Sequence, residues 1–262
     1  MLKKSTEITE LMQTEKQPET AVCAGEGYED RGRALAASLG LPFLSAEEVG
    51  RGRLRLTLDS CGLSLGDGRV YLSGDFSALG RRAEPRRLRE EYLVRAVAGK
   101  EPPSGGRVVD ATAGLGEDSF LLAAAGYEVE LYERDPIIAA LLADSLERAS
   151  DSGMSEIVAR MHLHRDDSIA AMKELDYEPY AILLDPMFPE RQKSGSVKKK
   201  FQLLGRLEQP CTDEEELMNA ALLARPKKIV VKRPLHGPYL AGRIPSHSYS
   251  GRLIRYDCIL PG

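Results

Sequence analysis

Short apolar runs alternate with segments of helical spacing from residue 107 to the end of the chain, and this order constrains the fold most. Helices are expected from about Ser119 to Ala125, from Pro136 after the cap Asp135, and from a capping box at Thr212 to about Ala224. Strands are expected at residues 107–110, 128–132, 161–164, 181–184, 228–231, near His247, and at 252–260. Such alternation predicts an α/β fold with a mostly parallel, doubly wound sheet.

The chain before residue 80 has a different pattern. Residues 1–20 are polar and predict a disordered lead-in. A short helix at 33–39, a strand at 53–58 and a hairpin at 63–72 predict a small α+β region over residues 21–80. Residues 81–262 then form the larger domain, which we expect to begin with one helix at 86–98 ending before Gly99.

Composition excludes several classes of protein. No apolar stretch reaches the length of a membrane span, and the N-terminus lacks the apolar core of a signal peptide. The four cysteines are scattered without a CxxC pair, which disfavours a zinc ribbon and fits a reduced cytoplasmic setting. His162 and His164 have no third ligand nearby, so no metal site is expected.

A glycine loop follows the first strand of the larger domain. Gly114 and Gly116 allow a tight turn and a close approach of backbone to a ligand, next to Asp110 at the strand end. A dinucleotide site would have a third glycine where Ser119 stands. The acids Glu117 and Asp118 would repel a pyrophosphate, whereas a cationic ligand would tolerate them.

A second group of polar residues completes a cofactor pattern. Glu133 ends the second strand at about the 20-residue spacing of an acid that binds ribose hydroxyls. A nucleoside without a large anionic group is indicated, and S-adenosylmethionine is the common one. Asp167 and Ser168, after the third strand, stand where an adenine contact would fall. The alternative for Asp110 and Glu133 is helix capping or surface exposure.

The residues Asp185-Pro186-Met187-Phe188 follow the fourth strand, at the sheet edge where open α/β folds bind ligands. Asp185 can accept a hydrogen bond from one N–H of an exocyclic amine, and the Pro186 carbonyl from the other. Phe188 can stack on the base. The alternative is a strand that stops at a proline beside a buried phenylalanine.

Clusters of basic residues predict a polynucleotide partner even though the formal net charge is −4. One cluster lies just beyond the Asp-Pro-Met-Phe element, another ends the fifth strand at the same edge, and an arginine run could widen the RNA footprint. The candidate RNA-binding residues are Lys193, Lys198, Lys199, Lys200, Lys232, Arg233, Arg86 and Arg87.

Four stretches resemble the bacterial RsmJ family: residues 110–120, 132–136, 185–194 and 230–234. The resemblance implies a Rossmann-like S-adenosylmethionine-dependent methyltransferase fold with a mostly parallel seven-stranded sheet. It also implies methyl transfer to the exocyclic N2 of a guanine in small-subunit (16S) ribosomal RNA, free or in the assembled small subunit. No membrane and no obligate protein partner are implied. By similarity, the cofactor contacts fall on Glu117, Asp118, Glu133, Arg134, Asp167, Ser168 and Asp185.

Three alternatives remain open at this point. The first is an amino methyltransferase that acts on adenine N6 or a protein amide, because these substrates present the same NH₂ group to Asp185 and to the Pro186 carbonyl. A nicotinamide-dependent oxidoreductase is disfavoured by Ser119 and by the acids of the glycine loop. A non-catalytic RNA-binding protein could also keep the fold.

Overall fold

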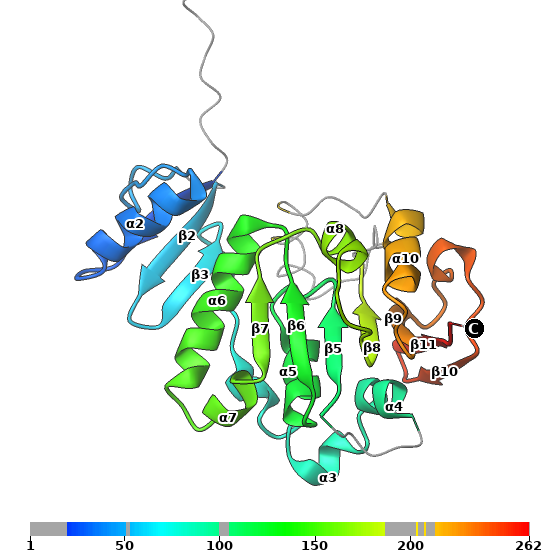
Figure 1. The fold of residues 1–262 in the computed structure, drawn as a ribbon. Coiled ribbons are helices and arrows are strands. Elements are labelled where there is room, and N and C mark those ends of the chain that lie inside the picture. Colours follow the sequence, from blue (N-terminus) through cyan, green and yellow to red (C-terminus); the bar gives the residue numbers. More distant parts are fainter. Residues whose placement is uncertain are drawn as a thin grey trace, which may run out of the picture. The chain divides into compact units, whose positions relative to one another are not determined.

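The computed structural model describes residues 20–50, 53–99, 105–186, 203, 207 and 213–261. The chain divides into two compact units, one of Met1–Cys61 with Leu65–Tyr71 and a larger one of Gly62–Ser64 with Leu72–Gly262 (Figure 1). The larger unit therefore begins ahead of the boundary near residue 80 that the sequence suggests.

A small four-stranded sheet has the order β1-β2-β3-β4. Its strands are β1 (Thr20–Ala24), β2 (Leu54–Asp59), β3 (Gly62–Gly66) and β4 (Tyr71–Leu72). The alternating Leu54, Leu56 and Leu58 of β2 are buried, as their spacing predicts. Helix α2 (Glu29–Leu39) starts earlier than expected and ends at Gly40 in the left-handed conformation.

The larger sheet has seven strands in the order β10-β11-β9-β8-β5-β6-β7, which confirms the expected fold class. The strands are β5 (Arg107–Asp110), β6 (Glu128–Tyr132), β7 (Met161–His164), β8 (Ala181–Leu184), β9 (Ile229–Pro234), β10 (His247–Ser250) and β11 (Ile254–Ile259). Strands β5 to β9 pair in parallel, while β11 is antiparallel to both β9 and β10. The chain order reverses between β5 and β8, and ligands of open α/β sheets bind beside such a reversal.

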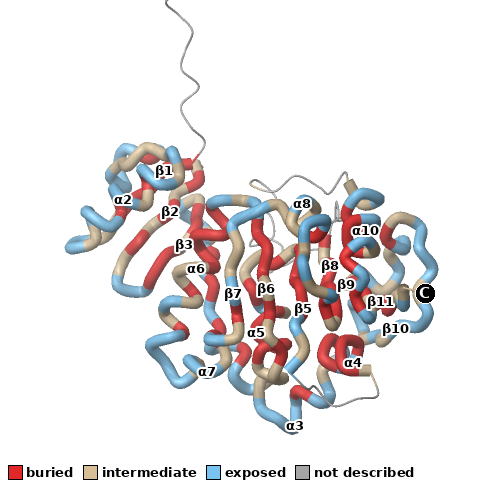
Figure 2. Tube along the Cα trace, viewed as in Figure 1, coloured by how far each residue is buried: buried red, intermediate tan, exposed pale blue. Residues whose placement is uncertain are grey.

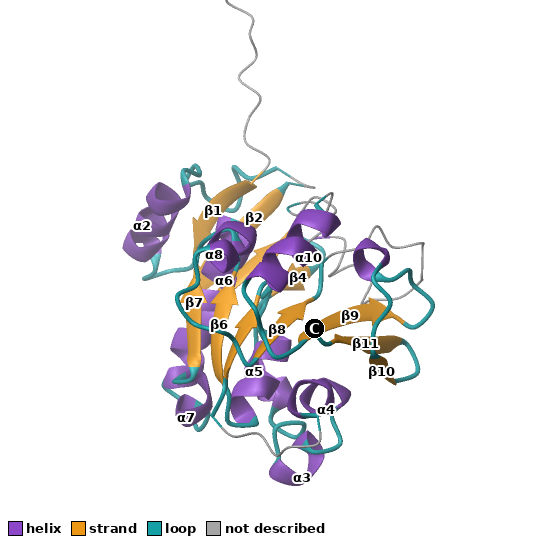
Figure 3. Ribbon diagram, turned by 45° about the vertical axis from the view of Figure 1, so that its right-hand side comes forward, coloured by secondary structure: helices purple, strands orange, loops and turns teal. Residues whose placement is uncertain are grey.

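Helices cover both faces of this sheet (Figure 3). They are α3 (Pro85–Leu88), α4 (Tyr92–Ala98), α5 (Glu117–Ala124), α6 (Pro136–Ser150), α7 (Ser155–Val158), α8 (Ser168–Lys173) and α10 (Glu214–Leu223), with short 3₁₀ turns η1 (Phe76–Leu79) and η2 (Leu240–Gly242). In the described ranges, no helix is long and apolar enough to cross a membrane.

The central strands are buried (Figure 2). Their successive residues contribute to different hydrophobic clusters. Val108 belongs to the cluster that contains Phe120 of α5, whereas Val109 belongs to the one that contains Leu217 of α10. This explains why β8 and the two central residues of β5 are apolar at successive positions rather than alternating.

Two local expectations differ from the structure. The single helix expected at residues 86–98 is two helices, because Glu91 adopts an extended backbone as the N-cap residue of α4. Arg82 forms a bidentate ion pair with the Glu91 carboxylate at 2.7 and 2.8 Å, which holds the break. Helix α10 starts at Glu214 with Asp213 as its N-cap residue, and Thr212 of the expected capping box lies outside the described residues.

The core on the α5 side can be tested at Phe120, which has no exposed surface and stacks on Phe76 with ring centroids 4.8 Å apart. We expect Phe120→Ala to lower the free energy of unfolding by about 3–5 kcal/mol, because it leaves a cavity in a packed core. Urea denaturation measures this. Leu223→Ala, at a position 67% exposed, is the control and should change the free energy by less than about 0.5 kcal/mol. Equal effects of the two changes would contradict the assignment of Phe120 to the core.

Candidate active site

Acidic residues end or follow the parallel strands at one edge of the larger sheet. Asp110 is the last residue of β5, Glu133 directly follows β6, Asp167 follows β7, and Asp185 directly follows β8. Because the strands are parallel, their carboxyl ends lie at the same edge, as the arrowheads of β5, β6 and β7 show (Figure 1). The fold therefore gathers carboxylates that are far apart in the sequence.

The glycine loop between β5 and α5 needs its two glycines for different reasons. Gly114 and Gly116 both have positive φ, at 55° and 75°, where other residues are strained. A Cβ on Gly114 would meet no neighbouring atom, so its backbone stays open on that side. A Cβ on Gly116 would lie 2.7 Å from Leu142 Cδ1, so close packing of the loop also requires glycine there.

Asp110 is buried under this loop, with 2% of its surface exposed. Its carboxylate accepts hydrogen bonds from the Ser119 hydroxyl and from the Thr112 N–H at 3.1 Å. Burial raises the pKa of Asp110 to about 7, although both hydrogen bonds favour the ionised form. Ser119, which replaces the glycine of a dinucleotide motif, is therefore a hydrogen-bond donor to the acid at the strand end.

Glu133 connects the glycine loop to the start of α6. One carboxylate oxygen accepts the Gly114 N–H at 3.0 Å and the other accepts the Asp135 N–H at 2.8 Å. The side chain is largely buried, and this burial raises the pKa of Glu133. Helix capping does not explain Asp110 or Glu133, because the N-cap residue of α5 is Gly116 and that of α6 is Asp135.

A lysine joins the loop helix to the end of β8. Lys232 on β9 places its Nζ 2.7 Å from an Asp118 oxygen and 2.9 Å from an Asp185 oxygen. The backbone N–H of Asp185 donates to the Thr112 hydroxyl at 2.7 Å. Asp185 is thus held by its backbone and by its carboxylate, while 39% of its side chain stays exposed at the edge.

The charges of this group influence one another. Burial raises the pKa of Asp185, and the Lys232 ammonium opposes that rise. Burial by itself would lower the pKa of Lys232, but Asp118 and Asp185 outweigh it and raise the pKa. Tyr256, the neighbour of Lys232 in β11, has its pKa raised by burial and by Asp118. The arrangement keeps Lys232 charged between two carboxylates.

The residues after β6 and β7 form a smaller group. Asp167 caps α8 by accepting the N–H groups of Ile169 and Ala170 at 2.8 and 3.2 Å. Its second oxygen lies 3.8 Å from an Arg134 nitrogen. Ser168 is the first residue of α8. Arg134, Asp167 and Ser168 thus meet at the same edge as the glycine loop, and cofactor contacts by them remain predictions.

The RNA-binding role expected for Arg233 is wrong. Successive strand residues point to opposite faces, so Arg233 turns away from Lys232 and is buried, with 1% of its surface exposed. One of its nitrogens lies 3.4 Å from both carboxylate oxygens of Glu214 on α10. A side chain with no exposed surface cannot contact a phosphate.

The other expected site residues stand as follows. Lys232 belongs to the acidic group described above, and only 24% of its side chain is exposed. Arg86 and Arg87 are exposed on α3, and Arg87 lies 3.4 Å from Glu84. Pro186 is buried. The predictions for Phe188, Lys193, Lys198, Lys199 and Lys200 lie outside the described residues.

Sequence reasoning missed several parts of the site. Thr112 and Ser119 lie within the loop motif, and their hydroxyls were available as a signal. The ion pairs of Lys232 could not be foreseen, because they depend on the side of the sheet that Lys232 faces.

His162 and His164 contact Glu128 and Glu130, at 3.0 and 2.7 Å, on the neighbouring strand. Within the described part of the chain, no group of residues is arranged to hold a metal ion.

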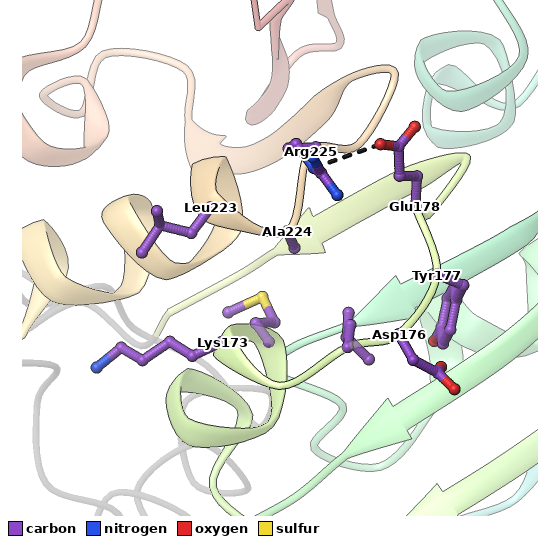
Figure 4. Close-up of a pocket in the computed structure, with 9 residues that line it drawn as sticks. Lys173, Asp176, Tyr177, Glu178, Leu223, Ala224 and Arg225 are labelled. Atoms are coloured by element: carbon purple, nitrogen blue, oxygen red, sulfur yellow. Dashed lines mark ion pairs between the residues drawn. The ribbon is translucent and has the colours of Figure 1, made fainter.

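A small pocket lies at the opposite end of β8, where that strand begins (Figure 4). Its lining includes Asp176, Tyr177 and Glu178 before β8 and Arg225 after α10, and Arg225 pairs with Glu178 at 3.3 Å. Because Asp185 follows the other end of β8, this pocket is separate from the acidic edge.

Comparison with known proteins gives the class of the fold. A family model described as "Putative SAM-dependent methyltransferase" matches residues 53–261. The crystal structure of a SAM-dependent methyltransferase from Neisseria gonorrhoeae superposes with a TM-score of 0.70 at 27% identity, over 92% of this chain and 96% of that one. The fold is that of a SAM-dependent (S-adenosylmethionine-dependent) methyltransferase.

Curated relatives narrow the class further. Ribosomal RNA small subunit methyltransferase J of Thioalkalivibrio sulfidiphilus is 45% identical over 91% of this chain and 96% of that protein. The protein of the same name from Marinobacter nauticus is 39% identical over 86% of this chain and 85% of its own length. The chain belongs to the ribosomal RNA small subunit methyltransferase J family.

The bridging role of Lys232 can be tested by titration. We expect Lys232→Met to raise the pKa of Asp185 further, because the ammonium no longer opposes the effect of burial. Carbon-13 NMR titration of labelled aspartates measures this shift. Lys173→Met is the matched control, since it removes an exposed lysine that pairs with Glu216 at 2.8 Å. An Asp185 pKa that is unchanged in Lys232→Met would contradict the proposed coupling.

Proposed function

We propose that this protein transfers the methyl group of S-adenosylmethionine to the exocyclic N2 of a specific guanine in small-subunit ribosomal RNA. The observation that carries the proposal is the fixed position of Asp185 at the end of β8, beside the glycine loop and bound to Lys232. Ribosomal RNA as the substrate is supported by the names of the relatives. The choice of guanine N2 is supported by the resemblance to the RsmJ family.

The carboxylates at the edge fit S-adenosylmethionine. This cofactor carries a cationic sulfonium and an ammonium group, and the edge supplies Asp110, Asp118 and Glu133 around the glycine loop. A pyrophosphate would meet the same carboxylates unfavourably, which argues against a nicotinamide cofactor. We propose Asp110, Gly114, Gly116, Glu117, Asp118, Glu133, Arg134, Asp167, Ser168 and Asp185 as the residues that hold or surround the cofactor.

The chemical task of the protein is to orient a weakly nucleophilic amine. When bound, the cofactor supplies an electrophilic methyl group. The lone pair of guanine N2 is delocalised into the ring, so the amine has to be aligned and the charge that builds on it stabilised. Asp185 accepts a hydrogen bond from one N–H of the amine, and the Pro186 carbonyl accepts a hydrogen bond from the other N–H.

Lys232 favours the ionised form of Asp185, the proposed hydrogen-bond acceptor for the amine. An ionised Asp185 can only accept hydrogen bonds, whereas a protonated one would also donate and could misorient the amine. The ammonium 2.9 Å away favours the ionised form against the effect of burial. Phe188 would stack on the base, and that role remains part of the proposal.

The acceptor geometry alone suits any planar NH₂ group, including adenine N6 and a protein amide. Family membership favours ribosomal RNA among these substrates. Ribosomal RNA also implies a cytoplasmic location for the reaction, which we include in the proposal. Free RNA and the assembled small subunit are both candidate substrates.

Labelled methyl transfer onto small ribosomal subunits from a strain that lacks the enzyme tests the proposal. We expect incorporation into the subunits or into the naked RNA, and N2-methylguanosine in the nuclease digest by mass spectrometry. Label in N6-methyladenosine would favour the adenine alternative. Incorporation in neither substrate, with S-adenosylmethionine still bound, would support a non-catalytic RNA-binding protein instead.

Asp185→Ala tests the acceptor directly. We expect at least about a 100-fold loss of methyl transfer, because the amine loses a positioned partner for its N–H, while the melting temperature stays close to wild type. Asp176→Ala, at the opposite end of β8, is the matched control and should retain activity. Turnover within about threefold of wild type in Asp185→Ala would rule out Asp185 as the hydrogen-bond acceptor for the amine.

Asp110 makes cofactor binding depend on pH. Its pKa of about 7 means that it gains negative charge between pH 6 and pH 8. If the cationic cofactor binds the ionised form, its affinity for the wild type should rise by about tenfold over this range. Asp110→Asn should remove this dependence, as measured by isothermal titration calorimetry at several pH values. An equal pH dependence in both proteins would show that Asp110 does not contribute to it.

A further inference from the structure

The C-terminal part of the chain has an unusual distribution of charge. The chain contains 40 aspartates and glutamates, but none lies between residues 217 and 256. The same stretch holds eight cationic residues, although the whole chain has a net charge of −4: Arg225, Lys227, Lys228, Lys232, Arg233, Arg243, Arg252 and Arg255. Four of these cations, Arg225, Lys232, Arg233 and Arg255, are paired with carboxylates in the fold. The exposed Arg252, in the turn between β10 and β11, suits a polyanionic partner.

Arg255 fixes the loop that follows β9. Although Arg255 is buried, its guanidinium donates to the backbone carbonyls of Pro234, Leu235 and Gly237 at 2.9, 2.7 and 3.0 Å. Its Nε donates to both carboxylate oxygens of Asp257 at 2.9 and 3.0 Å. One arginine therefore holds three successive parts of the loop, which makes the loop a rigid surface.

The ring of Tyr239 contacts the Arg255 guanidinium. The Arg255 guanidinium lies 5.0 Å from the centre of the Tyr239 ring, a cation–π contact, while 43% of Tyr239 remains exposed. The turn between β10 and β11 lies beside the loop, because the Leu235 N–H donates to the Leu253 carbonyl at 2.8 Å. That turn exposes Arg252 and Leu253.

We name this surface the C-terminal platform and define it by Pro234, His236, Tyr239, Arg252 and Leu253, all exposed. The platform begins where β9 ends, two residues beyond Lys232. The carboxyl end of β9 lies at the same edge as that of β8, which carries Asp185. The platform therefore continues the edge of the candidate active site within the same unit.

We propose that the C-terminal platform binds unpaired nucleotides of the RNA next to the target base, with Tyr239 stacking on a base and Arg252 contacting phosphate. This inference rests on the proposed function, since it assigns the RNA-contacting surface of that site. A target base has to be unstacked before its amine can reach an enzyme, so its neighbours are unpaired and available for stacking. An exposed ring held on one face by a guanidinium is suited to that role.

Filter binding with a labelled full-length small-subunit rRNA transcript tests the platform. We expect Tyr239→Ala to weaken RNA binding by about tenfold, because one base–aromatic stack is lost. Tyr239→Phe should bind within about twofold of wild type, because it keeps the ring. Arg252→Glu should weaken binding and lower the slope of log affinity against log salt by about one, because one phosphate contact is lost. The affinity for S-adenosylmethionine should be unchanged in all three variants.

Tyr71→Ala is the matched control, since Tyr71 is also exposed and also contacts an arginine, but lies on β4 of the small sheet. Wild-type RNA affinity in both Tyr239→Ala and Arg252→Glu would overturn the platform, and so would equal losses in Tyr71→Ala and Tyr239→Ala. If Tyr239→Ala and Arg252→Glu kept wild-type RNA affinity but lost binding to a protein, the platform would be assigned to a protein partner instead.

The platform and the proposed function can fail separately. Methyl transfer by the wild type onto small subunits is measured in parallel with RNA binding. Transfer by the wild type together with wild-type affinity in the platform variants would remove only the platform. Failure of the wild type to transfer methyl, with RNA binding still dependent on Tyr239, would remove only the proposed reaction.

Discussion

The parallel pairing of β5 with β6 on one side and β8 on the other is the constraint on which the rest of this structure depends. These strands are buried on both faces, so their direction and register are fixed by packing against two layers of helices. Once the register is fixed, Asp110, Glu133 and Asp185 have to emerge at one edge. The acidic edge is therefore a result of the sheet and not of any local motif.

Polar contacts then convert this edge into a site with defined chemistry. Glu133 holds the glycine loop, Thr112 holds the backbone of Asp185, and Lys232 connects Asp185 to the helix after the loop. Burial of these carboxylates opposes folding, as the raised pKa values of Asp110 and Glu133 show. Carboxylates whose pKa values are raised by burial in this way are typical of functional sites.

Much of this architecture could be predicted from the sequence, because short apolar runs determine buried strands. The expected strands at 128–132, 161–164 and 181–184 coincide with β6, β7 and β8. The glycine loop and the acids at the strand ends were predictable for the same reason. The break between α3 and α4 was not, since the Arg82–Glu91 pair that holds it joins residues nine apart.

The side chains on the later strands were the hardest part to predict. Lys232 and Arg233 are adjacent cations in the sequence, yet one joins the acidic edge and the other is buried against Glu214. Arg255 could not be recognised as the support of a loop, because its carbonyl partners are identified only by the antiparallel register of β11 on β9. Such roles depend on which face of a strand a residue occupies.

The two outer strands of the seven-stranded sheet have a consequence for folding in a crowded cell. In the part of the chain that the structure describes, β7 and β10 are these outer strands, and each is only four residues long. On β7, His162 and His164 are paired with Glu128 and Glu130. Short outer strands with ionisable side chains offer little surface for another chain to extend the sheet. Parallel sheets form slowly, so this protection against aggregation matters most while the chain is still incompletely folded.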